Sequence, residues 1–414
     1  MPKPDVVVVG AGAAGIMAAW RAATLGAQVL LLEKTPRVGT KILISGGGKC
    51  NITHHGSVDE VLRGFRTDEA RFLRPSFYRW TNDQVVALLT QRGLEVYVRP
   101  NGRVFPVEKT AKDVVAVLRS YLDEAGVELR LDSPVGSLEL SESRVAAVVV
   151  GSERIECQRV VVCTGGSSYP NSGTTGDGWH WARAAGHTIV PVRAALAPVY
   201  LELEEARAET LSGVALRDVV LKARADGREI DRWRGDLLFT HHGVSGPCAL
   251  EVSRALAEQP RTAALFLEVD VLPDQTPEET MEWARNALAE FPKRRVKTLV
   301  EGLVPESAAP WLLRAAEVDP ETVAGQLDRK SRNRLVATLK GWNLGAVRAI
   351  PLEKGEVVAG GVALDEVDPH TMGSRKCEGL FLCGEVLALA GRVGGYNLQA
   401  AWSTGYVAGE SAAR

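Results

Sequence analysis

The sequence lacks the cysteine and histidine patterns of two common kinds of functional centre. Its 414 residues include six cysteines but no Cys-x-x-Cys pair, and no histidines at metal-ligand spacing. A disulfide reductase needs two thiols within reach of each other, and a zinc site needs clustered Cys or His ligands. We therefore expect neither centre, and we expect the cysteines to be reduced and mostly buried. They are Cys50, Cys157, Cys163, Cys248, Cys377 and Cys383.

Long apolar runs and an excess of charge are also missing. No uninterrupted apolar run reaches the roughly 18 residues that a membrane span needs. The formal charge is only −2, which gives no reason to expect nucleic acid or an anionic membrane as a partner. The N-terminus carries one lysine, Lys3, begins as a β run and lacks a cleavage pattern. We expect a cytoplasmic protein with a small-molecule substrate; the sequence leaves its oligomeric state open.

The opening of the chain is a glycine-rich turn between two apolar runs. Four valines lead into Gly10, Gly12 and Gly15, and a second apolar run, residues 29–32, ends on Glu33. This order predicts a strand, a turn, a helix over residues 13–25 and a second strand closed by an acid. Such a unit binds a dinucleotide: the glycines allow the turn, the approach of a pyrophosphate and close packing, while the acid accepts ribose hydroxyls.

Segments near the other end indicate which dinucleotide is bound. Residues 379–385 predict a buried strand ending in Gly384-Glu385, and residues 391–408 predict a glycine loop followed by a small-residue helix. In FAD enzymes of the glutathione-reductase type, a late strand places its acid near the ribityl or phosphate region. The next helix then points its positive end at the flavin ring. A third strand, residues 159–163, runs into Thr164-Gly165. These segments favour FAD over NAD.

Several blocks of sequence resemble one known family of FAD enzymes, the BaiN-like flavoproteins, also described as the aminoacetone oxidase family. The blocks are residues 41–53 (KILISGGGKCNIT), 102–106 (GRVFP), 166–170 (GSSYP), 239–247 (FTHHGVSGP), 359–362 (AGGV) and 394–399 (GGYNLQ). The blocks occur in the same order as in the family, and the resemblance covers nearly the whole chain. It implies an α/β fold in which an FAD-binding Rossmann-like domain is split by a β-barrel-like module, itself split by helices. Activities in the family include oxidation of small aminoketones and reduction of steroid-like enones.

The resemblance also suggests individual site residues. It implies cofactor contacts at Thr40 and Lys41 and a backbone contact to adenine at Val135, and it places His241 at the family's Thr-His position. The full set of candidate cofactor-binding residues is Gly10, Gly12, Ala14, Gly15, Glu33, Lys34, Thr40, Lys41, Ser45, Gly46, Gly47, Gly48, Lys49, Cys50, Asn51, Val135, Thr164, Gly165, Gly384, Glu385, Gly394, Gly395, Asn397 and Leu398.

The loop at residues 45–51 is not a Walker A phosphate loop, because Leu43 stands where its first glycine is needed and Cys50 replaces Ser or Thr. We expect backbone N–H groups of this loop to wrap the flavin phosphates and Lys49 to neutralise their charge. We interpret Cys50 as a small packed residue or flavin neighbour rather than a nucleophile.

The candidate catalytic residues are His241 and Tyr396. A histidine lining the substrate cavity could take a proton from an amine or donate one to a reduced enone. A hydrogen-bonded pair in a domain interface is the alternative for His241 and His242, and core packing is the alternative for Tyr396 and Tyr169.

One stretch departs from the family. Many relatives carry acidic residues before the Gly-Gly-Tyr-Asn block, whereas this chain has Ala388-Leu389-Ala390-Gly391-Arg392. The change makes the flavin edge more positive and disfavours a cationic amine substrate. No second G-x-G-x-x-G follows residue 15, so NAD(P)H would have to visit the flavin transiently as a donor.

The pattern along the chain predicts three regions. The FAD-binding domain is expected at 1–193 and 355–414, a β-rich module at 194–260 and 342–354, and a helical insert at 261–341. Three functions stay open: a reductase using NAD(P)H, an aminoketone oxidase using oxygen, and a flavin-binding protein of RNA modification or redox sensing. The near-neutral charge argues against an RNA surface. Further helices are predicted at 57–63, 68–75, 81–92, 110–125, 174–186, 278–291, 294–303, 308–316 and 321–340; strands are predicted at 94–99, 127–132, 145–149, 214–223 and 236–240.

Overall fold

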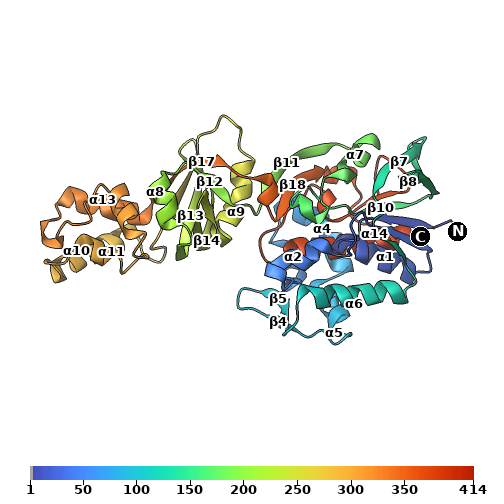
Figure 1. Cartoon of the computed structure of the whole chain (residues 1–414), viewed down its shortest axis with the longest axis horizontal. Coiled ribbons are helices and arrows are strands. Elements are labelled where there is room, and N and C mark those ends of the chain that lie inside the picture. Colours follow the sequence, from blue (N-terminus) through green and yellow to red (C-terminus); the bar gives the residue numbers. More distant parts are fainter. Residues whose placement is uncertain (1–2) are drawn as a thin grey trace. The chain divides into compact units, whose positions relative to one another are not determined.

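The computed structural model describes residues 3–414, which divide into two compact units. The first unit combines the N-terminal part of the chain, up to Val192, with Val357–Arg414, and the second is Arg193–Glu356. Figure 1 labels the elements of both units. Neither contains, among residues 3–414, a helix long and apolar enough to cross a membrane.

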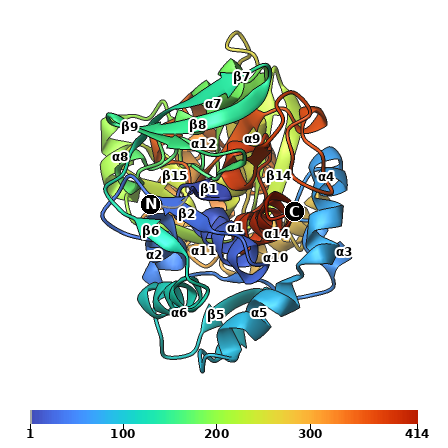
Figure 2. The same ribbon diagram turned by 90° about the vertical axis from the view of Figure 1, so that its right-hand side faces the viewer.

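The first unit is built on a five-stranded parallel sheet in the order β19-β10-β1-β2-β6. Its central strand β1 (Val6–Val9) is buried along its whole length, as expected for a strand covered on both faces. Figure 2 shows β1, β2 and β6 beside one another. The other strands are β2 (Val29–Leu32), β6 (Glu128–Arg130), β10 (Val160–Val162) and β19 (Leu380–Leu382). The sheet confirms the predicted Rossmann-like fold.

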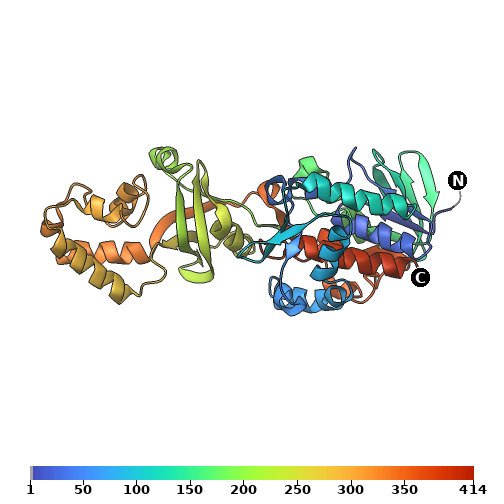
Figure 3. The same cartoon turned by 90° about the horizontal axis from the view of Figure 1, so that it is seen from below.

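Two helices from opposite ends of the chain pack side by side in this unit. They are α1 (Ala13–Thr24) and α14 (Tyr396–Ala412), shown next to each other in Figure 3. Small residues allow the close approach: a Cβ on Gly405 would lie 2.2 Å from the carbonyl oxygen of Ala14. The small residues of α14 therefore bring the middle of this helix against the start of α1.

Smaller elements complete the first unit. Two three-stranded antiparallel sheets have the orders β3-β5-β4 and β7-β8-β9, and β11 pairs with β18. The strands are β3 (Thr53–His54), β4 (Val96–Val98), β5 (Arg103–Pro106), β7 (Val135–Ser141), β8 (Arg144–Val150), β9 (Glu153–Glu156), β11 (Ile189–Ala195) and β18 (Val357–Val362). The helices are α2 (Thr40–Gly48), α3 (Val58–Leu62), α4 (Thr67–Arg79), α5 (Asn82–Thr90), α6 (Ala111–Glu124) and α7 (Asp177–Ala184), with short 3₁₀ turns η1 (Pro170–Ser172), η4 (Leu364–Glu366) and η5 (Gly384–Val386).

The second unit contains a closed six-stranded barrel, which confirms the predicted β-barrel-like module. Its strand order is β12-β15-β14-β13-β16-β17. Long β13 alternates buried and less buried side chains, the period-two pattern of a strand with one face inside. The strands are β12 (Val199–Leu201), β13 (Ala215–Ala225), β14 (Arg228–Thr240), β15 (Gly243–Ser245), β16 (Leu265–Asp270) and β17 (Trp342–Ala349); α8 (Glu205–Leu211) and α9 (Gly246–Ala257) accompany them, and η3 (Leu352–Lys354) follows.

A helical insert lies in the sequence between β16 and β17 and shares one hydrophobic core with the barrel. Buried Val296 and Leu312 of the insert belong to the same cluster as barrel residues Leu221 and Trp342. The insert contains α10 (Pro277–Glu290), α11 (Val296–Val300), α12 (Ala309–Ala315), η2 (Ala324–Gln326) and α13 (Arg329–Lys340).

Three expectations from the sequence need correction. Residues 261–270 were expected in the insert, but Leu265–Asp270 forms β16 of the barrel. The helix expected at 321–340 begins only at Arg329, because the Asp328 side chain caps it by accepting from the Ser331 N–H. The loop predicted at residues 45–51 overlaps a helix, because α2 extends over Thr40–Gly48 with a break at Ser45–Gly47.

Candidate FAD-binding and active site

The glycine turn after β1 has the geometry that a pyrophosphate requires. Gly10 has φ +101°, and a Cβ there would come 2.7 Å from the Cys163 carbonyl oxygen; a Cβ on Gly15 would come 1.8 Å from the Gly10 oxygen. These two positions accept only glycine. By contrast, a Cβ on Gly12 meets nothing within 4 Å, and no side chain caps α1. Open space therefore lies against the positive end of α1, where phosphate is favoured.

Glu33 is held at the end of β2 by the backbone. Its two carboxylate oxygens accept the N–H groups of Ala11 (2.7 Å) and Thr35 (2.9 Å). The Ser133 N–H also donates to the Glu33 carbonyl, so the residues leading to Val135 lie beside this acid. A carboxylate has acceptor sites beyond those two hydrogen bonds, and these are available to the hydroxyls of a ribose.

We predict that Glu33→Ala weakens FAD binding by about one to two orders of magnitude. Hydrogen bonds to a charged group contribute roughly 1.5–3 kcal/mol. The measurement is FAD titration into deflavinated protein, followed by tryptophan fluorescence. Because Glu33 also binds two backbone N–H groups, the melting temperature of the apoprotein is compared in parallel. Unchanged FAD affinity would show that Glu33 does not contact the ribose.

The glycine triplet that ends α2 exposes backbone rather than side chains. Gly46, Gly47 and Gly48 all have positive φ, and a Cβ on Gly47 would meet nothing within 4 Å. The Ser45 hydroxyl donates to the Ile42 carbonyl. This segment fits a phosphate-wrapping role through N–H groups, although it begins from a helix and not from a loop.

The cysteine side chains are thiols packed inside the protein. All six cysteines are free and buried, as predicted. Burial raises the pKa of Cys50 to about 12, which supports its interpretation as a packed residue. Cys163 and Cys383 lie with their sulfur atoms 3.3 Å apart on neighbouring strands, and burial also raises the pKa of Cys163. Spacing in the sequence did not reveal this pair.

The structure joins two predicted cofactor residues, Lys41 and Glu385, in an ion pair. Lys41 Nζ lies 2.6 Å from Glu385 Oε2 and 2.9 Å from the Ser168 hydroxyl, and the other Glu385 oxygen accepts the Val358 N–H. Thr164 and Gly165 follow β10 at the same edge of the sheet. Lys34, by contrast, binds Asp177 and Thr175 at the start of α7, both at 2.6 Å. Thr40 contacts the Arg37 carbonyl.

The loop before α14 is fixed by close packing and by a side-chain hydrogen-bond pair. Gly395 has φ +93°, and a Cβ there would lie 2.4 Å from the Thr53 carbonyl. The Asn397 side chain both donates to and accepts from Gly391, so it shapes the loop. No side chain caps α14, and the Gln399 N–H donates to the Gly395 carbonyl in its first turn. A negative charge at this end is stabilised.

Tyr396 stacks on a histidine that the sequence analysis did not single out. The rings of Tyr396 and His54 are 4.5 Å apart at 19°. His54 Nδ1 lies 3.1 Å from the Gly394 carbonyl; because a carbonyl only accepts, Nδ1 carries the proton. Partial burial lowers the pKa of His54 from 6.5, so the ring is neutral near pH 7. In the sequence, the only feature that could have pointed to His54 is its position directly after Thr53, the last residue of the family block at residues 41–53.

The two histidines of the second unit lie at the tip of the turn joining β14 and β15. Both His241 and His242 are exposed. The His242 carbonyl accepts the Leu201 N–H at 2.9 Å, and its ring lies 5.2 Å from that of Tyr200. Within the second unit, His242 therefore contacts the barrel through a hydrogen bond and a ring contact. Among residues 3–414, the His241 ring has no hydrogen bond or ring contact. The predicted catalytic role of His241 stays a prediction.

The fold and these residues define a flavin-dependent oxidoreductase of the FAD-binding Rossmann type. The chain belongs to the HI0933-like family, since residues 4–411 match the HI0933-like protein Rossmann domain. This full-length match confirms the resemblance to BaiN-like flavoproteins.

Three curated relatives match essentially the whole chain. A ribosomal RNA dihydrouridine synthase of Haemophilus influenzae is 31% identical over 99% of this chain and 98% of its own length. The Escherichia coli protein of that name is 31% identical over 98% and 97%. A 3-dehydro-bile acid delta(4,6)-reductase of Clostridium scindens is 29% identical over 98% of both chains.

Solved structures show the same fold. A 3-ketosteroid delta1-dehydrogenase from Sterolibacterium denitrificans covers 100% of both chains with a TM-score of 0.54 and 16% identity. An E. coli quinol fumarate reductase FrdA variant covers 99% of this chain and 70% of its own, with a TM-score of 0.52 and 16% identity.

Proposed function

We propose that the protein is an FAD-dependent reductase that adds hydride from NAD(P)H to a carbon–carbon double bond conjugated to a carbonyl. The observation that carries the proposal is the charge around the start of α14. Residues 387–399 contain one charged side chain, the exposed Arg392, and Glu385 is compensated by Lys41. A protonated amine would find no counter-charge here, whereas a carbonyl oxygen gaining negative charge would be stabilised.

The names of the full-length relatives support the same chemistry. A dihydrouridine synthase must reduce a double bond of the uracil ring, and a delta(4,6)-reductase removes double bonds conjugated to a 3-oxo group. In both reactions, the double bond is activated by a carbonyl. This shared feature favours reduction over the aminoketone oxidation that the family resemblance also suggests.

The chain's own residues have distinct roles in this proposal. When bound, FAD supplies the hydride carrier. The glycine turn and Glu33 hold the adenosine end, the N–H groups beginning α14 hold negative charge at the other end, and Tyr396 is the candidate proton donor. Its ring is oriented by the stack with His54. His241 is the second candidate, from the other unit. No dedicated nicotinamide domain follows the first turn, so NAD(P)H is a transient donor.

Anaerobic stopped-flow mixing with NADH and with NADPH tests the proposal. We expect the 450-nm flavin absorbance to be lost with at least one donor and restored when an enone such as 2-cyclohexenone is added. No bleaching by either nucleotide, together with bleaching by aminoacetone and oxygen uptake, would instead establish an amine oxidase.

A further inference from the structure

The small sheet β3-β5-β4 of the first unit carries a row of basic side chains across one face (Figure 1). In its register, His54 of β3 lies opposite Arg103 of β5. The Arg99 N–H, directly after β4, donates to the Arg103 carbonyl at 2.9 Å across the hairpin. Opposite residues of antiparallel strands point to the same face of a sheet. His54, Arg103 and Arg99 therefore follow one another across the three strands.

Two aromatic rings continue this row along the β4–β5 hairpin. Tyr97 and Phe105 are paired across the strands, and their ring centres are 6.1 Å apart at an angle of 29°. The Arg99 guanidinium lies 4.1 Å from the centre of the Phe105 ring. Residues two apart on a strand point the same way, so Arg103 shares this face with Phe105. We call these residues the hairpin face: His54, Tyr97, Arg99, Arg103 and Phe105.

The hairpin face adjoins two segments of the candidate FAD site. His54 stacks on Tyr396, the first residue of α14. Phe105 packs against the glycine triplet, since a Cβ on Gly46 would lie 2.9 Å from Phe105 Cε1. These contacts all lie within the first unit. A ligand on the hairpin face would therefore lie beside the segments that we assign to the flavin phosphates and to the flavin ring.

Fold stability does not account for the two arginines of this face. Neither forms an ion pair among residues 3–414, and the one polar contact of the Arg99 side chain is 3.5 Å long, from Nη2 to the Tyr97 hydroxyl. Glu95 precedes β4, at the end of the hairpin away from both arginines. Burial lowers the pKa of His54, and the nearby charge of Arg103 adds to this effect. Because like charges directly opposite each other are destabilising, a bound anion would stabilise this arrangement.

We propose that the hairpin face binds the phosphate groups of the nicotinamide dinucleotide that reduces FAD. This inference rests on the proposed function, which requires a transient donor without a domain of its own. Arginine forks bind phosphate oxygens in pairs, which assigns this role to Arg99 and Arg103. The Tyr97 ring is 39% exposed and offers a stacking surface for the adenine. The nicotinamide end of the donor then extends along the face toward His54 and Tyr396.

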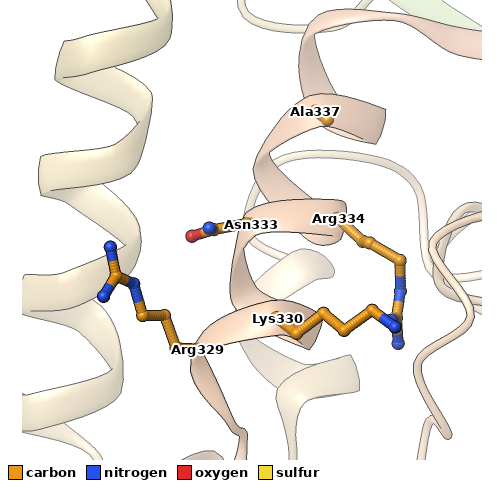
Figure 4. A pocket seen from close by; sticks show the side chains of 5 residues that line it. All are labelled: Arg329, Lys330, Asn333, Arg334 and Ala337. Atoms are coloured by element: carbon orange, nitrogen blue, oxygen red, sulfur yellow. The ribbon is translucent and has the colours of Figure 1, made fainter.

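The exposed cations of helix α13 provide a comparison, because they lack the features of the hairpin face. Figure 4 shows Arg329 and Lys330 extending to opposite sides of the helix. The hollow beside them is lined by Arg329, Lys330, Asn333, Arg334 and Ala337, which include no aromatic side chain. A dinucleotide needs cations for its phosphates and a flat surface for its base. The hairpin face offers both on one side of a sheet, and the α13 surface does not.

Calorimetric titration of the FAD-loaded protein with NADP⁺ and with NAD⁺ tests the inference without turnover. In Arg99→Gln/Arg103→Gln we expect binding at least about tenfold weaker. A loss with both nucleotides would place the pyrophosphate at the arginines, and a loss with NADP⁺ alone would place the 2′-phosphate there; either result supports the inference. Arg99→Lys/Arg103→Lys keeps the charge and should lose less affinity. Tyr97→Ala should weaken binding at least about fivefold, whereas Tyr97→Phe keeps the ring and should not.

The matched control removes two cations from α13. Arg329→Gln/Lys330→Gln changes the net charge by the same amount, and both side chains are exposed, so it should leave both affinities within about twofold. Wild-type affinity in Arg99→Gln/Arg103→Gln, equal loss in the two double variants, or no binding of either nucleotide by the wild type would overturn the inference. So would loss of FAD from Arg99→Gln/Arg103→Gln with nucleotide binding retained, because the arginines would then hold the flavin phosphates.

Anaerobic flavin reduction separates this inference from the proposed function. We expect the NAD(P)H concentration that gives half the maximal rate of reduction to rise at least about tenfold in Arg99→Gln/Arg103→Gln. Reduction of the wild-type flavin with no such rise in the variant would refute the hairpin face and retain the reductase. Nucleotide binding that depends on Arg99 and Arg103, without flavin reduction by either nucleotide, would refute the reductase and retain the binding face.

Discussion

Gly12→Val should yield a folded protein that cannot hold FAD. A Cβ at this position meets no protein atom within 4 Å, and φ is −80°, which any residue adopts. The branched side chain would instead occupy the open space at the start of α1, where we place the pyrophosphate. We expect FAD affinity to fall by about 10³-fold, equivalent to roughly 4 kcal/mol.

FAD titration and thermal unfolding of the apoprotein separate the loss of FAD affinity in Gly12→Val from any loss of fold stability. The apoprotein should melt within a few degrees of the wild-type apoprotein. Gly12→Ala, which adds one carbon atom, should give a smaller loss of affinity. A yellow Gly12→Val protein with wild-type FAD content would show that the pyrophosphate does not lie against Gly12.

Replacing Glu410 should have the largest effect on stability. Its carboxylate is 8% exposed and accepts hydrogen bonds from Arg21 (2.6 Å) and Arg79 (2.7 Å), which joins α14 to α1 and α4. Glu410→Gln leaves the mostly buried Arg21 without a counter-charge. Since Arg79 is half exposed, we expect a loss of roughly 2–3 kcal/mol rather than the full value for a buried pair. The melting temperature of the first unit should fall by roughly 4–12 °C.

The pH dependence of this effect has a definite sign. Hydrogen bonds from Arg79, and then from Arg21, lower the pKa of Glu410 from 4.5 to about 2. A carboxylate whose pKa is lower in the folded state contributes stability above the unfolded pKa and loses it as the pH falls toward the folded pKa. The difference in the free energy of unfolding between the wild type and Glu410→Gln should therefore have its full value above about pH 5 and shrink toward pH 2.

An exposed carboxylate is the matched control for Glu410. Glu124 pairs with Arg92 on the surface of the same unit, where ion pairs contribute little. Glu124→Gln should hardly change the melting temperature at any pH. If Glu410→Gln lowers the free energy of unfolding in chemical denaturation as little as Glu124→Gln does, the ion pairs of Glu410 with Arg21 and Arg79 do not hold α14 to α1.

Local patterns predicted the parts of the site that lie next to one another in the sequence. The valine run, the three glycines and Glu33 each have a fixed spacing that follows from strand, turn and helix geometry. The late strand ending at Glu385 and the small-residue helix after it were predicted for the same reason. Their roles in FAD binding await the measurements above.

Other features depend on contacts that spacing does not encode. Lys41 and Glu385 are 344 residues apart, and the stack of His54 on Tyr396 joins β3 to α14. The start of α13 was misplaced because Val323 and Leu327 continue an apolar helical period, while the capping signal of Asp328 competes with it.

The cofactor itself provides the most direct test of the central claim. Purified protein should be yellow, and acid denaturation should release a flavin that chromatography and mass spectrometry identify as FAD, in nearly stoichiometric amount. The glycine turn, Glu33 and the late helix α14 together predict this result. Release of NAD or FMN, or a flavin that stays attached to the denatured chain, would contradict it.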